Sequence, residues 1–336
     1  MNENIIYLFI IINIPIIFFY DQINSKINIF DKADNVRKMH SQKVSLFGGI
    51  LILYNFLLIV FLDLKFNFKN DIYFIYNKEY FSFFFGLIFC FIVGLYDDKF
   101  NLSAFKKLFF NFIIIFIVVT VDDNLVIREL NFSFLEHSIK LDNFAYFFTI
   151  LCVLLFMNAL NMFDGINLQT GFYSLIILSI FLFKNIYIFF NLVLILSIIL
   201  FLFYNNLNRA FLGDSGTQIL AFLISYQIIK SYNLNSSFQP EEIFIILSIP
   251  GLDMFRLFIS RILKGNHPFK ADSDHLHHLI GLKLGNLYPL LIIQMTILIN
   301  IIIFYILEEK LISLIFTILF YIFLFLIFKN KKGKQI

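Results

Sequence analysis

Two neighbouring carboxylates and a nearby lysine are the first residues whose types and spacing could do chemistry. Asp97 and Asp98 end one apolar stretch, and Lys107 lies near the start of the next. Adjacent carboxylates can bind a divalent cation or accept a proton. The same dipeptide recurs at Asp122-Asp123 without such neighbours, so a solvated loop that ends a helix is the alternative interpretation of the pair.

Three polar residues at the end of a later apolar stretch form a second group. Asn158, Asn161 and Asp164 are spaced three apart, which places them along one side of a helix, and Gly165 follows. Polar groups in an apolar helix usually face the bundle interior or a wet cavity. Hydrogen bonding between helices would explain the two asparagines but not Asp164-Gly165, and we therefore favour a binding site.

A glycine-flanked aspartate forms the third group, directly before the apolar stretch 217–230. Gly213 and Gly216 surround Asp214. Glycine lets a backbone approach a ligand closely, and we expect the first N–H groups of the following helix to be free to bind phosphate. Asp214 would then hold Mg²⁺ against that phosphate. The alternative is an ordinary Gly-Asp-Ser-Gly turn.

A histidine cluster forms the fourth group. His275, His277 and His278 could suggest zinc, but one regular helix cannot direct all three to one point, and no cysteine is near. We instead expect the imidazoles and Arg256 to bind a pyrophosphate. Arg256 also follows Asp253 at a spacing of three, so an ion pair within a helix is the alternative for these two.

A basic segment forms the fifth group. Arg37, Lys38 and His40 precede the pair Gly48-Gly49 at the start of an apolar stretch. Positive charge on the cytoplasmic side of a membrane and close packing of helices explain these residues as well as ligand binding does.

The surroundings of these groups are too apolar for a soluble protein. Of the 336 residues, 60% are hydrophobic and only 15% are charged, whereas soluble domains are about 45–50% apolar and about 25% charged. This excludes a soluble enzyme, a disordered chain and a secreted disulfide scaffold. A membrane-spanning helix needs about 20 mainly apolar residues. We predict an all-α polytopic bundle of eleven spans, at 5–20, 45–64, 80–96, 105–121, 144–162, 170–183, 186–204, 217–230, 241–263, 287–307 and 311–328.

The orientation follows from the basic residues. Most of the 26 lysines and arginines fall in the loops after the odd-numbered spans and in the C-terminal tail, which the positive-inside rule places in the cytoplasm. We therefore expect an outside N-terminus, a cytoplasmic C-terminus and a cytoplasmic active site. We predict one domain over 1–336, with the motifs in about 37–280, two C-terminal helices in 287–328 and a basic tail at 329–336.

The order of the groups resembles a known family. Asp97-Asp98, Asn158-x-x-Asn161-x-x-Asp164-Gly165, Gly213-Asp214-x-Gly216 and His275-x-His277-His278 follow one another as in the bacterial polyprenyl-phosphate N-acetylhexosamine-1-phosphate transferases. That superfamily also contains the phospho-MurNAc-pentapeptide transferase, but the His-Leu-His-His form is similar to the hexosamine branch. Each motif is weak alone, whereas four in this order are specific.

The resemblance implies a location in the bacterial inner membrane and a Mg²⁺-dependent phosphoryl transfer, with Mn²⁺ as an alternative. Polyprenyl phosphate would attack the β-phosphorus of a UDP-sugar, which gives a polyprenyl-diphospho-sugar and UMP and starts a cell-surface polysaccharide such as O-antigen. Asp214 would be the metal ligand, one of Asp97 and Asp98 would orient or deprotonate the lipid phosphate, and Lys107 would lie near that phosphate.

The resemblance also implies which residues bind the donor. The nucleotide or sugar would contact Asn158, Asn161 and Asp164, and the diphosphate would contact Arg256, His275, His277 and His278. Two positions depart from the family pattern. Where the family has a second aspartate after Asp164, this chain has Asn167, so an acid role at that position does not carry over from the family. The usual Pro-Arg before the glycines is replaced by Ser45-Leu46, so the binding mode of that loop does not carry over either.

Other readings stay open on the sequence alone. A lipid-linked glycan transporter or flippase would also need many spans and intramembrane polar groups, but such proteins often contain repeats, and none is visible. An inactive scaffold for glycan assembly is a third reading. The sequence leaves open the transferred sugar, with UDP-N-acetylglucosamine as the default, the glycan pathway, and whether the chain forms a homodimer. We expect no nucleic-acid partner.

Overall fold

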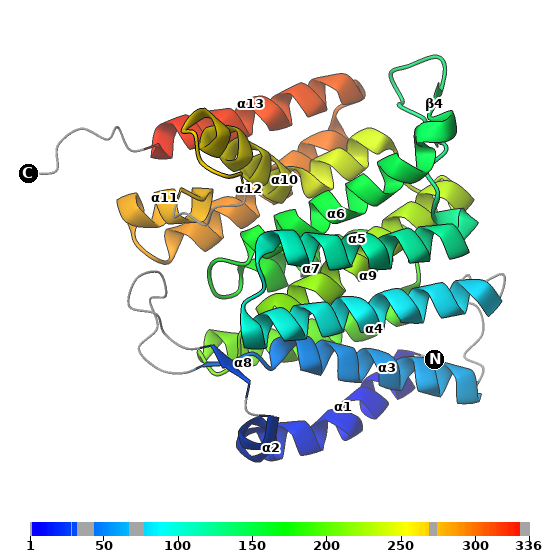
Figure 1. The fold of residues 1–336 in the computed structure, drawn as a ribbon, viewed down its shortest axis with the longest axis vertical. Coiled ribbons are helices and arrows are strands. Elements are labelled where there is room, and N and C mark those ends of the chain that lie inside the picture. Colours follow the sequence, from blue (N-terminus) through cyan, green and yellow to red (C-terminus); the bar gives the residue numbers. More distant parts are fainter. Residues whose placement is uncertain (1, 28, 32–43, 67–76, 269–273, 330–336) are drawn as a thin grey trace, which may run out of the picture. The chain divides into compact units, whose positions relative to one another are not determined.

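The apolar stretches of the sequence fold as helices (Figure 1). A computed structural model describes residues 2–27, 29–31, 44–66, 77–268 and 274–329. Each of the predicted spans lies largely within one long helix. The predicted basic segment Arg37–His40 and the tail residues 330–336 lie outside the described residues.

The eleven helices that correspond to the predicted spans are all α-helices of at least 15 residues. They are α1 (Asn2–Phe18), α3 (Gly48–Phe66), α4 (Asn77–Phe100), α5 (Ala104–Val121), α6 (Ala145–Phe163), α7 (Gln169–Phe183), α8 (Ile188–Asn206), α9 (Gly213–Asn235), α10 (Pro240–Leu263), α12 (Tyr288–Ile306) and α13 (Lys310–Phe328). Backbone groups in lipid must be paired within their own segment, which favours helices for such stretches.

Seven of these helices in the described residues are long and apolar enough to cross a membrane: α4, α5, α6, α8, α10, α12 and α13. The chain is thus a helical, multi-pass membrane protein, while the count of eleven spans and the orientation stay predictions. Helix α9 is outside this group because residues such as Gln218, Gln227 and Lys230 lower its hydropathy. Its side chains are buried from Ser215 to Tyr232, so it has no need of a lipid-facing apolar surface.

Local signals set where several helices begin. Ser103 precedes α5, and its hydroxyl accepts a hydrogen bond from the N–H of Lys106 at 3.4 Å, as N-cap residues do. Helix α10 begins with Pro240, followed by Glu241 and Glu242 in its first turn. Proline has no N–H to leave unpaired there, and the acidic residues complement the positive end of the helix dipole.

Short elements that the sequence analysis did not predict connect the long helices. They are the helices α2 (Tyr20–Ile27) and α11 (Leu276–Leu284), the 3₁₀ turns Asp123–Leu125 and Asp142–Phe144, and two antiparallel pairs, β1 (Phe30–Asp31) with β2 (Val44–Ser45) and β3 (Glu129–Leu130) with β4 (Ile139–Lys140). Strands of two residues leave no periodic pattern in a sequence.

The chain divides into two compact units. The first unit contains Met1–Asp123 and Thr170–Gln227, and the second contains Asn124–Gln169 and Ile228–Ile336. In the first unit α4 packs against α5, and α3 packs against α8; in the second, α10 packs against α6, α12 and α13. The candidate site residues are distributed over both units, and each unit is described by itself below.

Candidate active site

The first unit joins three of the predicted residues in one buried cluster. The Nζ atom of Lys107 lies 2.8 Å from Oδ2 of Asp97 and 2.9 Å from Oδ1 of Asp214. The three side chains come from the end of α4, the start of α5 and the first turn of α9. Their exposed fractions are 11% for Lys107, 9% for Asp97 and 30% for Asp214, so Asp214 is the more accessible carboxylate.

Asp98 caps helix α9. Its carboxylate accepts hydrogen bonds from the backbone N–H of Asp214 at 2.7 Å and of Ser215 at 3.0 Å. Our expectation that these first N–H groups are free to bind phosphate is therefore wrong for these two, because a carboxylate from α4 already satisfies them. The two neighbouring aspartates thus have different partners: Asp97 contacts Lys107, and Asp98 contacts the start of α9.

Asp98 can reach the first turn of α9 because α4 and α9 approach each other closely there. A Cβ atom on Gly94, one turn before the aspartates on α4, would lie 2.5 Å from Cα of Ser215 and 2.6 Å from the carbonyl oxygen of Asp214. Any larger residue would push α4 away from the start of α9. The glycine therefore positions both aspartates.

A second polar contact lies one helical turn below the cluster. Nδ2 of Asn111 donates to Oε1 of Gln218 at 3.0 Å, and both side chains are almost fully buried. Asn111 follows Lys107 by four residues on α5, and Gln218 follows Asp214 by four on α9, so the same faces meet twice. The sequence analysis missed this pair. Its signal was a single amide, Asn111, within an otherwise apolar stretch, and a glutamine near the start of the more polar stretch 217–230.

The chemistry of this cluster suits a hard divalent cation. The carboxylates of Asp97 and Asp214 contact one ammonium group, and the Asp98 carboxylate binds the backbone N–H of Asp214, so the acidic side chains here offer only oxygen ligands. Among the described residues no three His, Cys, Asp or Glu side chains form a ready metal cage. Mg²⁺ in phosphoryl-transfer sites is typically held by one or two carboxylates plus substrate phosphates and water, so Asp214 fits that ion without a cage.

In the second unit, the predicted polar row lies at the end of α6. Asn158 and Asn161 are on the last turns of the helix, Asp164 is its C-cap residue, and all three are half-buried. Nδ2 of Asn158 donates to the carbonyl oxygen of Leu154 at 2.8 Å. Asn158 and Asn161 thus lie within the helix, whereas Asp164 follows its end with backbone angles of −76° and 61°, so their alignment along one side stays a prediction.

Gly165 brings this row against the histidine cluster. A Cβ atom on Gly165 would collide with the imidazole ring of His277 at Nε2 and Cε1. His277 is only 3% exposed, and its Nε2 atom has no hydrogen-bond partner among the residues that the structure describes. Burial, together with the nearby rings of His278 and His275, lowers the pKa of His277 from 6.5 to about 3. The imidazole is therefore neutral at physiological pH.

The three histidine rings lie close together. Ring centroids are 5.3 Å apart for His275 and His277, 4.2 Å for His277 and His278, and 6.1 Å for His275 and His278. The three histidines do not share one regular helix, because His275 precedes it: His275 is the N-cap residue of α11, with extended backbone angles of −62° and 148°. In the part of the chain that the structure describes, the three still form no group that could hold a metal ion, in line with the case against zinc.

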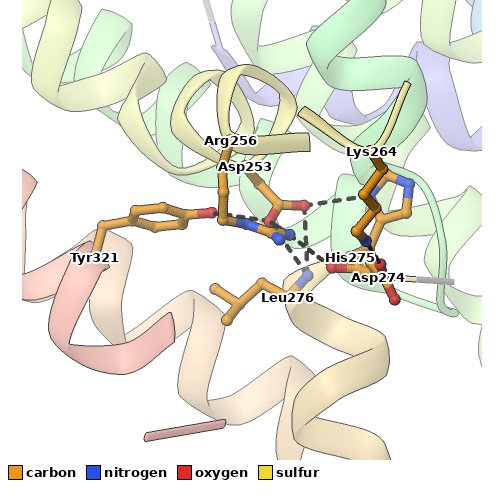
Figure 2. Close-up of polar contacts among 7 residues, drawn as sticks. All are labelled: Asp253, Arg256, Lys264, Asp274, His275, Leu276 and Tyr321. Carbon is orange, nitrogen blue, oxygen red and sulfur yellow. Dashed lines mark hydrogen bonds and ion pairs between the residues drawn. The ribbon is translucent and has the colours of Figure 1, made fainter. Parts of the chain in front are cut away.

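Asp253 is the centre of a hydrogen-bond network that holds His275 (Figure 2). Its Oδ2 atom lies 3.2 Å from Nδ1 of His275, and its Oδ1 atom accepts from Nη2 of Arg256 at 2.7 Å and from the hydroxyl of Tyr321 at 2.9 Å. The N–H of Leu276 also points at this carboxylate, at 3.3 and 3.4 Å from its two oxygens.

Arg256 is committed to contacts inside the second unit. Besides Asp253, its guanidinium donates to the carbonyl oxygen of Asp274 at 2.6 Å and to the hydroxyl of Tyr321 at 3.0 Å, and it lies 4.4 Å from the ring centroid of Phe325. This geometry favours the ion-pair alternative for Arg256. Its contact with a diphosphate stays a prediction.

Comparison with known proteins gives a consistent result. The profile of glycosyl transferase family 4 matches residues 80–232. The undecaprenyl-phosphate alpha-N-acetylglucosaminyl 1-phosphate transferases of Salmonella typhi and Escherichia coli O157:H7 are 26% and 27% identical to this chain, over 79% of it and 72% of their own length. The chain is thus similar to glycosyl transferase family 4 over the segment 80–232. A probable undecaprenyl-phosphate N-acetylglucosaminyl 1-phosphate transferase of Bacillus subtilis is 30% identical over 62% of the chain and 61% of that protein.

The resemblance drawn from the motifs is thereby confirmed, and the protein is an enzyme. The segment that the family profile matches contains the whole Lys107 cluster and the polar row on α6. The histidines and Asp253 lie beyond it. The predicted site residues thus form two clusters, one in each unit, and their catalytic and binding roles stay predictions. The sequence analysis missed Tyr321, a single tyrosine within the apolar stretch 311–328.

Proposed function

We propose that this protein is a family 4 transferase, which moves a sugar-1-phosphate, an N-acetylhexosamine-1-phosphate by preference, from a UDP-sugar to undecaprenyl phosphate and releases UMP. The observation that carries the proposal is the position of Lys107 between the carboxylates of Asp97 and Asp214, inside the segment matched by the family profile. The names of the relatives support the acceptor and the transferred group.

The reaction exchanges one phosphorus–oxygen bond for another. An oxygen of the lipid phosphate attacks the β-phosphorus of the donor, the bond from that phosphorus to the bridging oxygen breaks, and UMP leaves with the bridging oxygen. Phosphoryl transfer of this kind depends mainly on positioning and on neutralising charge. The ammonium of Lys107 would neutralise the lipid phosphate, and Asp97 would keep that ammonium in place. A phosphate monoester has a second pKa of about 6, so a strong base is unnecessary.

A divalent cation fits the same cluster. Asp214 would hold Mg²⁺, or Mn²⁺ in its place, because its carboxylate is the more exposed partner of Lys107. When bound, the ion would screen the negative charge of the donor's diphosphate. Asp98 would act indirectly, since its hydrogen bonds to the start of α9 orient the backbone that carries Asp214.

The second unit would bind the donor. The half-buried row of Asn158, Asn161 and Asp164 offers amide and carboxylate groups suited to a nucleotide or sugar. His275 and His278 would approach the diphosphate, and the neutral His277 supplies a buried nitrogen without a partner beside Gly165. Within the membrane we expect the orientation given above, with these residues at the cytoplasmic face of the inner membrane.

The proposal is tested with purified protein in detergent, undecaprenyl phosphate, Mg²⁺ and a panel of UDP-sugars, with UMP release as the readout. We expect UMP from one donor, and its loss on addition of EDTA and in Asp214→Asn. Asp123→Asn is the matched control, because Asp123 is an exposed carboxylate paired with the exposed Lys78, and it should keep full activity. Folded wild-type protein that releases no UMP from any donor would contradict the proposal.

A further inference from the structure

We propose that Tyr321 is a positioning residue, whose hydroxyl braces Asp253 and Arg256 and thereby holds the turn that presents His275. Tyr321 is on α13, the last long helix of the chain, far from the motifs in sequence. The significance of the brace for catalysis rests on the proposed function, because His275 is expected to approach the donor's diphosphate. The brace itself is a property of the second unit alone.

The Tyr321 hydroxyl connects both members of an ion pair. It donates to Oδ1 of Asp253 at 2.9 Å and accepts from Nε of Arg256 at 3.0 Å, while Arg256 and Asp253 contact each other at 2.7 Å (Figure 2). The three groups close a triangle in a buried environment, where Tyr321 is only 4% exposed. Hydrogen bonds to charged groups are stronger than neutral ones, and burial raises the cost of losing one.

The braced side chains in turn hold the turn before α11. Arg256 donates to the carbonyl oxygen of Asp274, and Asp253 accepts from the N–H of Leu276 and contacts Nδ1 of His275. Three consecutive residues, Asp274 to Leu276, are therefore attached to two side chains of α10. The carboxylate contact also sets the orientation of the His275 ring, as second-layer carboxylates do for functional histidines.

Two features distinguish Tyr321 from an ordinary polar residue of a packed helix. The hydroxyls of Ser313 and Thr317, on the same helix, donate to backbone carbonyl oxygens of that helix, three and four residues earlier in the chain. Tyr321 instead reaches a different helix, and Phe325, one turn further along α13, places its ring 4.4 Å from the Arg256 guanidinium. Both residues of this face of α13 therefore contact the same arginine.

The brace is tested first without any substrate. In Tyr321→Phe the ring is kept and only the hydroxyl is lost. We expect faster backbone hydrogen exchange in the segment 275–284 of the purified full-length protein, and unchanged exchange in the segment 288–306. Tyr305→Phe is the matched control, because the Tyr305 hydroxyl also bonds a buried carboxylate of the second unit, that of Glu242. It should leave the exchange of 275–284 unchanged.

The positioning role is tested by steady-state kinetics on the same proteins. We expect Tyr321→Phe to raise KM for the UDP-sugar by about tenfold, with kcat and KM for undecaprenyl phosphate changed by less than about twofold. A merely structural role would lower the active fraction, and hence kcat, with both KM values unchanged. Unchanged exchange at 275–284, or a donor KM equal to that of Tyr305→Phe, would overturn the proposal. A wild-type protein without transferase activity would refute the proposed function, while the exchange measurement would still decide the brace.

Discussion

The Nζ atom of Lys107 lies 2.9 Å from Oδ1 of Asp214. This contact joins the start of α5 to the start of α9, although the two residues are 107 positions apart in the chain. The same ammonium contacts Asp97 at the end of α4. One lysine therefore holds together the ends of three helices, and the account of catalysis depends on it.

Removal of the Lys107 charge should strongly reduce turnover and destabilise the first unit. Lys107→Met leaves the carboxylates of Asp97 and Asp214 without their cation, and breaking a buried ion pair costs about 3 kcal/mol or more. We expect turnover to fall by about a hundredfold, together with a lower midpoint of thermal unfolding. Lys106→Met is the control, because Lys106 is exposed. Equal effects of the two substitutions would contradict the account.

The amide pair below the cluster should show energetic coupling. Asn111→Leu and Gln218→Leu each leave one buried amide group without its partner, at a cost of about 1–3 kcal/mol in the free energy of unfolding. The double variant should cost less than the sum of the two, because neither amide is then left unpaired. Denaturant unfolding in detergent gives the free energy of unfolding of the wild type, the two single variants and the double variant. Strict additivity would show that the hydrogen bond does not join α5 to α9.

A methyl group on residue 165 should displace the imidazole of His277. In Gly165→Ala the new Cβ atom collides with the ring, so we expect a several-fold higher KM for the UDP-sugar. Gly281→Ala serves as the comparison on the helix of His277, because its Cβ atom would make only an ordinary 3.5 Å contact with Pro289. Gly281→Ala should leave the KM for the UDP-sugar unchanged, and the free energy of unfolding unchanged or slightly higher. A donor KM unaffected by Gly165→Ala would separate His277 from donor binding.

The buried His277 should make stability depend on pH. The pKa of His277 is about 3 in the folded protein and 6.5 when exposed, so below pH 6.5 the unfolded state binds the proton first. Its contribution to the free energy of unfolding is fully present above pH 6.5. It is lost as the pH falls from 6.5 towards 3, by at most about 1.4 kcal/mol per pH unit.

The measurement compares circular-dichroism melting between pH 5 and 8 for the wild type and two variants. His277→Gln should flatten the decline of the melting temperature below pH 6.5, whereas His137→Gln, at an exposed position, should leave it unchanged. A decline of the same steepness in His277→Gln would assign the pH dependence to other groups.

Much of the fold could be predicted from the sequence because lipid leaves the backbone few choices. Long apolar stretches must be helical, and each of them is. Asn158 and Asn161 could also be placed at the end of a helix, because they close a long apolar stretch. The order of the motifs was specific enough to indicate the family.

The remaining features depend on contacts between distant segments. Asp98 caps a helix that begins more than a hundred residues later, and local sequence carries no sign of it. Tyr321 was missed because a single tyrosine in an apolar helix resembles ordinary packing. The histidine rings converge because His275 precedes α11, and helix ends are the least certain feature of any sequence-based prediction.

The central claim is that the phosphate moves together with the sugar. The most direct measurement supplies UDP-N-acetylglucosamine labelled with ³²P at the β-phosphorus to the purified protein with undecaprenyl phosphate and Mg²⁺, and then separates lipid from water. The account predicts that the label enters the lipid fraction while unlabelled UMP appears in the aqueous fraction in equal amount. Label that stays in water as UDP, while the sugar reaches the lipid, would show transfer of the sugar alone and contradict the account.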